Sequence, residues 1–160
     1  MAAWSDIEQA APDFAARVRR LFDAGRHKTL ATLRADGSPR ISGTECEFVD
    51  GELRFGSMVG ARKLADLLRD PRFALHGPTF HPEPGKENEW PGEAKVAGRA
   101  VRAGDEPSDE PSDEPSDEPS GVSFVADITE VVITGLNPDA TMLVVEFWTP
   151  EHGLRRVERA

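Results

Sequence analysis

Thr29-Leu30-Ala31-Thr32-Leu33-Arg34-Ala35-Asp36-Gly37-Ser38-Pro39-Arg40-Ile41-Ser42 is the stretch that decides the fold. Its first five residues have the composition of a strand, and Asp36-Gly37 is typical of a two-residue hairpin turn. We therefore predict a strand over residues 29–33 and a second strand over residues 39–49. The β-structure of the chain thus begins with a hairpin.

Strand patterns continue through most of the remaining sequence. Asp50-Gly51 predicts a second tight turn. Further strands are predicted at residues 52–56, 73–77, 93–101, 128–134, 142–147 and 154–157. Many strands with few helices indicate an antiparallel barrel or sandwich, and therefore a mainly β fold.

Helical patterns are confined to two segments. Ser5 and Glu8 fit a capping box at the start of an N-terminal helix, which Pro12 would kink and Gly25 would end. Leucines at helical spacing predict a short second helix over residues 61–69, before Asp70-Pro71.

An acidic repeat dominates the charge of the chain. The sequence Asp105-Glu106-Pro107-Ser108 occurs four times in succession, and its eight acidic groups leave only −2 of the formal net charge of −10 for the rest. Because residues 105–120 include no apolar side chain, we expect a disordered, solvated insertion in a single domain that spans residues 1–160. The nearly neutral remainder lacks the basic stripe that nucleic-acid binding needs.

Cysteine and histidine usage limits the chemistry. Cys46 is the single cysteine, which excludes an intrachain disulfide and a cysteine-based zinc cluster and fits a reduced compartment. The four histidines have no close pair at ligand spacing, so we expect no metal site. Neither a signal-peptide pattern nor an apolar run of about 20 residues occurs, and we expect a soluble, cytoplasmic protein without membrane association.

The segment from Gly56 to Leu64 is a candidate anion site, because a strand end there runs through small residues into the short helix. Arg62 and Lys63 would lie in the first helical turn, where cations oppose the helix dipole unless an anion compensates. Free N–H groups together with a guanidinium and an ammonium match a phosphate monoester. The same pattern also fits two solvated charges on an ordinary surface helix.

Several stretches resemble, in order and spacing, the pyridoxamine-phosphate-oxidase-like family of flavin-binding split barrels, closer to its actinobacterial flavin and deazaflavin members. The similar stretches are residues 29–42, Gly51-Glu52-Leu53-Arg54-Phe55-Gly56-Ser57, the run from Arg62 to His76, and residues 92–100, 127–132 and 145–148. The resemblance implies an antiparallel split β-barrel that forms a homodimer, with a flavin in each of two grooves between the subunits.

The resemblance also implies which residues hold the cofactor around the short helix. Arg62 and Lys63 would bind the flavin phosphate, as the physical argument indicates independently. Ser57 and Met58 would border the ring system or the ribityl chain. Alternatively, Ser57 has no role in cofactor binding and only ends the strand.

Two further groups of cofactor-binding residues follow from the resemblance. Arg40, Ile41 and Ser42 would run beside the isoalloxazine, although Arg40 also fits an exposed strand position. Trp148 and Arg155 would reach across the dimer to the cofactor or substrate, although a large aromatic such as Trp148 also suits a core.

The first functional hypothesis is an FMN-dependent oxidoreductase that transfers hydride to or from a small organic substrate. Vitamin B6 oxidation is not expected. True pyridoxamine-phosphate oxidases have additional basic residues on the second strand and a C-terminal segment for the substrate phosphate, whereas this chain has Glu45-Cys46-Glu47 and the segment from Gly153 to Val157 at those places. A reductase dependent on the deazaflavin coenzyme F-420 is the alternative, with Lys95 and Arg99 as possible contacts for its acidic tail. A non-catalytic flavin- or haem-binding module and a cofactor-free structural dimer are further alternatives.

Overall fold

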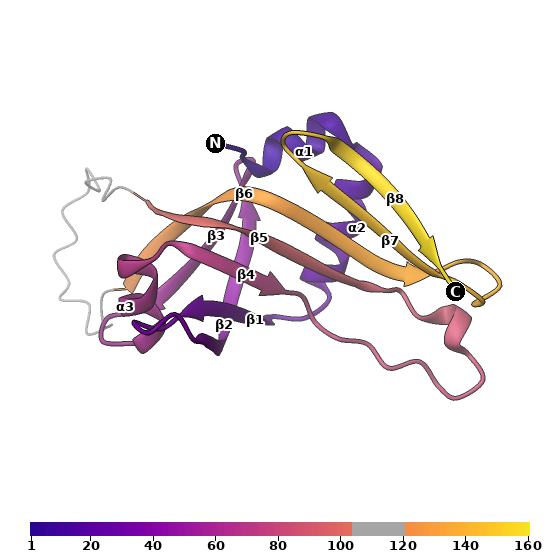
Figure 1. Cartoon of the computed structure of the whole chain (residues 1–160), viewed down its shortest axis with the longest axis horizontal. Helices are drawn as coiled ribbons and strands as arrows, with labels where there is room; N and C mark the ends of the chain where they lie inside the picture. The colour runs from indigo at the N-terminus through magenta and orange to yellow at the C-terminus, as the bar shows by residue number, and fades with distance from the viewer. Residues whose placement is uncertain (104–120) are drawn as a thin grey trace, which may run out of the picture.

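Eight strands and three α-helices make up the computed structural model, which describes residues 1–103 and 121–160 (Figure 1). The acidic repeat lies outside the described residues, so its disorder stays a prediction. No α-helix among the described residues is long and apolar enough to cross a membrane.

The elements follow one another in the order that the sequence predicts. The α-helices are α1 (Trp4–Ala10), α2 (Pro12–Asp23) and α3 (Arg62–Arg69), and a 3-10 turn covers Glu87–Glu89. The strands are β1 (His27–Leu33), β2 (Pro39–Val49), β3 (Glu52–Met58), β4 (Arg72–His76), β5 (Glu93–Arg102), β6 (Gly121–Leu136), β7 (Leu143–Thr149) and β8 (Gly153–Arg159).

The strands form a single antiparallel sheet that closes on itself. Their order is β3-β2-β1-β4-β5-β6-β7-β8, and an additional pairing of β3 with β6 closes the first six strands into a barrel. The β7–β8 hairpin extends the sheet beyond β6. The predicted antiparallel split β-barrel is thus confirmed.

Local sequence explains both early hairpins. Gly37 has a φ of 82°, and Asp50 and Gly51 have φ values of 51° and 75°, which is the left-handed backbone that tight hairpin turns require. Strand β2 between these turns has the predicted bounds.

The N-terminal prediction was wrong in two respects. Two helices replace the single kinked one, because Pro12 stands at the first position of α2, where its missing N–H costs nothing. Ser5 does not cap α1, which begins at Trp4. Instead the Ser5 amide donates to the carbonyl of Gly51 at 2.8 Å, and the Glu8 carboxylate accepts from Trp4 Nε1 at 2.9 Å.

Strand β6 is longer than predicted because it pairs with β3, β5 and β7 in turn. A bulge interrupts its pairing with β5 between Ala97 and Gly98. A Cβ at Gly98 would lie 2.1 Å from the Asp127 carbonyl oxygen, so the close approach of the two strands requires glycine there.

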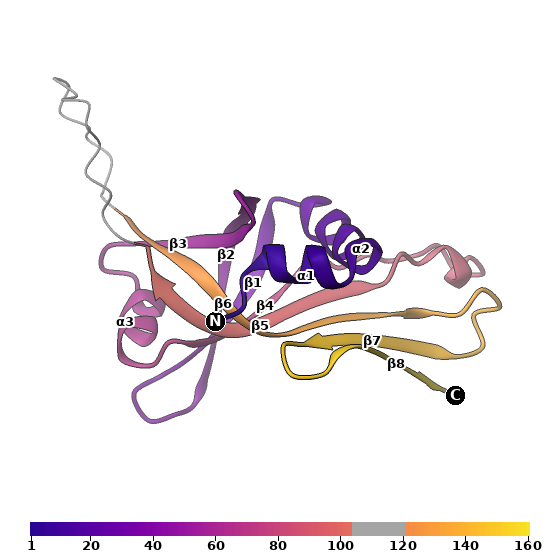
Figure 2. The ribbon, with the colours of Figure 1, turned by 90° about the horizontal axis from the view of Figure 1, so that it is seen from above.

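Helices α1 and α2 pack on only one of the two faces of the sheet. Helices α1 and α2 lie over one face of β5, β6 and β7, as Figure 2 shows, and Arg17 of α2 pairs with Glu146 of β7 at 2.6 Å. Helix α3, the remaining α-helix among the described residues, lies at the other end of the molecule from β7 and β8 in both views. The register places both small or apolar residues and charged residues such as Lys95 and Glu130 on the opposite, outer face of the sheet. We define the outer face by its small and apolar members, Ala31, Ile41, Ala74, Ala97, Val132, Val145, Phe147 and Val157.

Candidate functional site: a groove where the barrel splits

Strands β2 and β3 pair along only part of their length. Cys46–Val49 pair with Glu52–Phe55, whereas the earlier part of β2 pairs with β1 and the end of β3 pairs with β6. The two strands therefore part, as Figure 1 shows, and leave facing backbone edges that do not pair with each other.

A groove of about 720 Å³ occupies this split. Five elements contribute to its wall: His27 of β1, residues 43–45 of β2, 56–58 of β3, 121–123 of β6, and Ala61 and Lys63 at the start of α3. A Cβ built on Gly43 would meet nothing within 4 Å, so glycine leaves open space beside β2. Unpaired backbone edges and free space suit a flat ligand with polar edges.

Helix α3 brings a cation to one end of the groove. Gly60 turns the chain into the helix with a φ of 85°, and Ala61 offers no side chain to cap the first N–H groups. Lys63 Nζ donates to the Gly43 carbonyl at 2.9 Å, across the split. Burial lowers the pKa of Lys63, so an anion beside this ammonium would compensate for its partial desolvation.

Arg62 lies on another side of the helix. It is exposed and lines a second hollow, of about 450 Å³, together with Arg34, Arg40 and Arg69. Neighbouring residues on a helix point about 100° apart, which explains why Arg62 and Lys63 face different hollows. The two predicted phosphate ligands thus flank the start of α3 from two sides.

Asp66 holds α3 to the barrel, a role that the sequence did not predict. Its carboxylate is buried and accepts hydrogen bonds from Thr32 Oγ1 at 2.8 Å, Arg40 Nε at 2.7 Å and Arg69 Nη2 at 2.9 Å. Burial alone would raise the pKa of Asp66, but these bonds hold it at about 2. Arg40 is therefore engaged with α3, and no local sequence signal links it to Asp66.

The other residues predicted on β2 and β3 fall into two places. Ser57, which is buried, and Met58, which is 65% exposed, both line the groove. Ile41 lies on the outer face with 74% of its surface exposed, beside an apolar hollow of about 460 Å³. Ser42 is half-buried between Ile41 and Gly43 on β2.

Trp148 and Arg155 lie on the β7–β8 hairpin and do not line the groove of their own chain. Trp148 points to the helix-covered face, is 4% exposed, and its Nε1 has no hydrogen-bond partner within the described part of the chain. Arg155 is exposed and pairs in register with Phe147 of the outer face. Their cofactor roles stay predictions that involve a second subunit.

Comparison with known proteins gives a match to one family model. Residues 14–134 match the model described as pyridoxamine 5'-phosphate oxidase. No protein of curated function matches the sequence significantly.

Solved structures share the fold across most of the chain. A pyridoxamine 5'-phosphate oxidase-related, FMN binding protein from Nostoc punctiforme PCC 73102 has 15% identity and a TM-score of 0.61, covering 100% of this chain and 98% of its own. PhzG from Burkholderia lata 383, in complex with tetrahydrophenazine-1-carboxylic acid, has 14% identity and a TM-score of 0.60, with coverage of 95% and 88%. A heme binding protein from Mycobacterium smegmatis has 15% identity and a TM-score of 0.52, with coverage of 89% and 86%.

Proposed function

Because the chain belongs to the pyridoxamine 5'-phosphate oxidase family, we propose that it binds FMN in the groove between β2 and β3 and acts as an oxidoreductase on a small organic substrate. The observation that carries this proposal is the position of Lys63, a partly buried cation at one end of a groove with unpaired backbone edges. This arrangement provides for an anionic tail and for a flat polar ring in one continuous site.

The phosphate would bind at the start of α3. The first N–H groups of this helix have no side-chain cap, its first turn contains no acidic residue, and Lys63 stands beside them. Helix N-termini and ammonium groups both stabilise phosphate. Arg62 would add long-range attraction from the other side of the helix.

The ring would lie along β2 and β3. Gly43 leaves open space there, and Met58 offers an exposed apolar side chain at the rim. When bound, FMN would supply the hydride transfer, while the chain would hold the ring in place and exclude water. Neither task requires a catalytic acid or base from the protein.

We include a homodimer in the proposal because the outer face exposes large apolar side chains among its charged ones. Ile41 is 74% exposed and Val157 is 40% exposed on this face, and exposed apolar patches mark association sites. A second copy on this face would shield it and bring another β7–β8 hairpin, with Arg155, toward the groove. The single cysteine fits the cytoplasmic location that we also propose.

The absorption spectrum of the purified protein tests the cofactor. A flavin spectrum supports the proposal, whereas a haem spectrum, or a colourless protein that binds only added coenzyme F-420, contradicts it. Turnover with a panel of reductants and acceptors then tests the oxidoreductase activity.

Fluorescence titration of FMN tests the site. Lys63→Met should weaken FMN binding at least tenfold, about 1.4 kcal/mol. Arg62→Met should have a smaller effect, because Arg62 lines the second hollow. Lys86→Met changes an exposed lysine far along the chain, in the loop before β5, and serves as the control. Equal affinities for all three variants and the parent would refute the assignment.

A further inference from the structure

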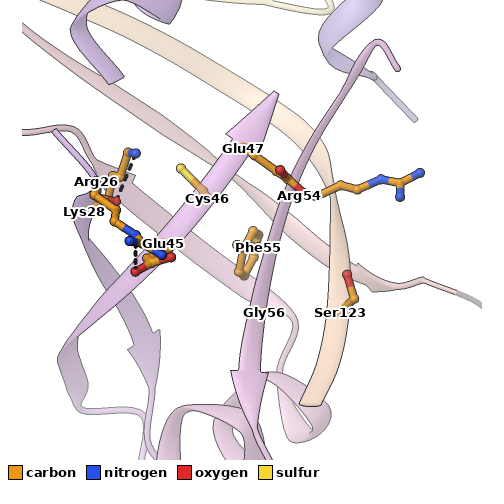
Figure 3. A pocket seen from close by; sticks show the side chains of 9 residues that line it. All are labelled: Arg26, Lys28, Glu45, Cys46, Glu47, Arg54, Phe55, Gly56 and Ser123. Carbon is orange, nitrogen blue, oxygen red and sulfur yellow. Dashed lines mark hydrogen bonds and ion pairs between the residues drawn. The ribbon is translucent and has the colours of Figure 1, made fainter. Parts of the chain in front are cut away.

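A polar pocket of about 380 Å³ adjoins the groove at the point where β2 and β3 part. Figure 3 shows the side chains around it, which come from β1, β2, β3, β6 and the residue before β1. Glu45, Gly56 and Ser123 line both the pocket and the groove, so the two spaces are direct neighbours.

Two of the three cations at this pocket already have carboxylate partners. Arg26 Nε lies 2.9 Å from the Glu45 carboxylate, and Arg54 Nη2 lies 2.8 Å from that of Glu52. Lys28 is only 6% exposed, and among the described residues its ammonium makes no ion pair and donates only to the Arg26 carbonyl, at 3.2 Å. A buried ammonium with one neutral partner is costly unless an anion joins it.

The fold explains how Lys28 comes to be buried. Lys28, Leu30 and Thr32 alternate on the inner side of β1, and Thr32 meets α3 at one end of the barrel while Lys28 stands at the other. Cys46, on β2, lies near enough for the Lys28 charge to act on its thiol. Burial nevertheless raises the pKa of Cys46 to about 11, so this thiol stays neutral and does not act as the counter-ion.

We propose that this pocket binds the carboxylate of a small organic acid, with the Lys28 ammonium as its anchor. A monoanion fits better than a dianion, because the carboxylates of Glu45 and Glu47 also line the pocket and repel added negative charge. Because the pocket and the groove share three wall residues, the acid would lie next to the flavin and would be its substrate. That last identification rests on the proposed function, whereas the anion site itself does not.

Isothermal titration calorimetry of the full chain, with benzoate and inorganic phosphate as probes, tests the site. We expect one benzoate per chain and phosphate binding at least about tenfold weaker. Lys28→Met should reduce benzoate affinity at least about tenfold, while Arg20→Met, which removes an exposed cation on α2, should leave it unchanged. Benzoate binding that is absent in the parent, or equal in Lys28→Met, would overturn the proposal.

A second variant tests the site without altering the buried Lys28, whose substitution could also disturb folding. Glu47→Gln alters an exposed side chain and should raise phosphate affinity relative to benzoate, because it removes one repelling charge. An unchanged ratio contradicts the proposed preference for a monoanion.

Lys63→Met separates this proposal from the flavin proposal. It should lose FMN affinity and keep benzoate affinity, whereas Lys28→Met should do the reverse. Benzoate binding at Lys28 in a protein that never binds flavin would leave the anion site standing and remove only its link to catalysis.

Discussion

The Asp66 carboxylate and the Arg40 guanidinium lie 2.7 Å apart and join α3 to β2 at one end of the barrel. The side chain of Asp66 is 3% exposed and that of Arg40 is 17% exposed, so this ion pair is shielded from solvent. Because Lys63 stands on the same helix, the pair fixes the position of the cation at the groove. Arg40 thus acts on the groove through α3.

Asp66→Asn should destabilise the protein. The change keeps the shape of the side chain but removes the charge that three donors share, and hydrogen bonds to charged groups contribute about 1.5–3 kcal/mol. We expect the free energy of unfolding in urea to fall by roughly 2–3 kcal/mol. Asp70→Asn, which affects an exposed pair with Arg72, is the matched control, and equal losses in both variants would argue against a special role for Asp66.

The stabilisation from Asp66 should depend on pH. Its pKa is about 2 in the folded protein against 3.8 for an ordinary aspartate, so the unfolded chain binds the proton first as the pH falls. The difference in unfolding free energy between the parent and Asp66→Asn should be constant well above pH 3.8 and shrink toward pH 2. Other carboxylates with a lowered pKa, such as Asp70, are present in both proteins, so their contributions to the pH dependence cancel in this difference. A difference that stays constant down to pH 2 would contradict the assignment.

Gly43→Val should block the groove without unfolding the chain. A Cβ at Gly43 meets nothing within 4 Å, and valine suits a strand, so the free energy of unfolding should change by no more than about 0.5 kcal/mol. A ring lying along β2 would clash with the new methyl groups, and FMN affinity should fall at least tenfold by fluorescence titration. Gly43→Ala should have an intermediate effect. Unchanged affinity in both variants would place the ring elsewhere.

Val157→Arg should dissociate the proposed dimer. Val157 is 40% exposed on the outer face, whereas Leu154 is 43% exposed and pairs in register with Trp148 of the helix-covered face. Leu154→Arg is therefore a matched control on the same strand. Light scattering should report a monomer for Val157→Arg and a dimer for the control and the parent, and a monomeric parent would remove the outer-face interface altogether.

Cys46 should resist alkylation in the folded protein. Burial raises its pKa from 9.0 to about 11, so only about a thousandth of the thiol is ionised at pH 8. Mass spectrometry should detect slow reaction with iodoacetamide in buffer and fast reaction in urea. Equal rates in the two solvents would show that the thiol is not protected.

Local sequence was sufficient for much of the architecture. The turns at Asp36-Gly37 and Asp50-Gly51 and the bounds of β2 follow from residues next to one another in the chain. The start of α1 also follows from a local contact, in which the Ala3 amide donates to the Asp6 carboxylate at 2.8 Å. The prediction instead placed the cap at Ser5, whose amide bonds to the distant Gly51. The length of β6, in contrast, depends on the strands that it joins.

The candidate site was predictable only in part. Lys63 was predicted from its place in the first turn of the short helix, and Ser57 and Met58 were predicted from the family resemblance. All three line the groove. Lys28 and Asp66 were missed, because each acquires its role from burial among residues of other elements.

The sequence by itself determined the strands, the turns and the cationic start of α3, because these depend on neighbours along the backbone. Tertiary structure alone decided which hollows Arg62 and Lys63 line, and that Lys28 is buried with no ion-pair partner among the described residues. Pairing of β3 with β6 joins segments far apart in the chain, and it determines which edges of β2 and β3 stay unpaired. No local pattern specifies such a closure, since its free energy comes from contacts that exist only once the barrel has formed.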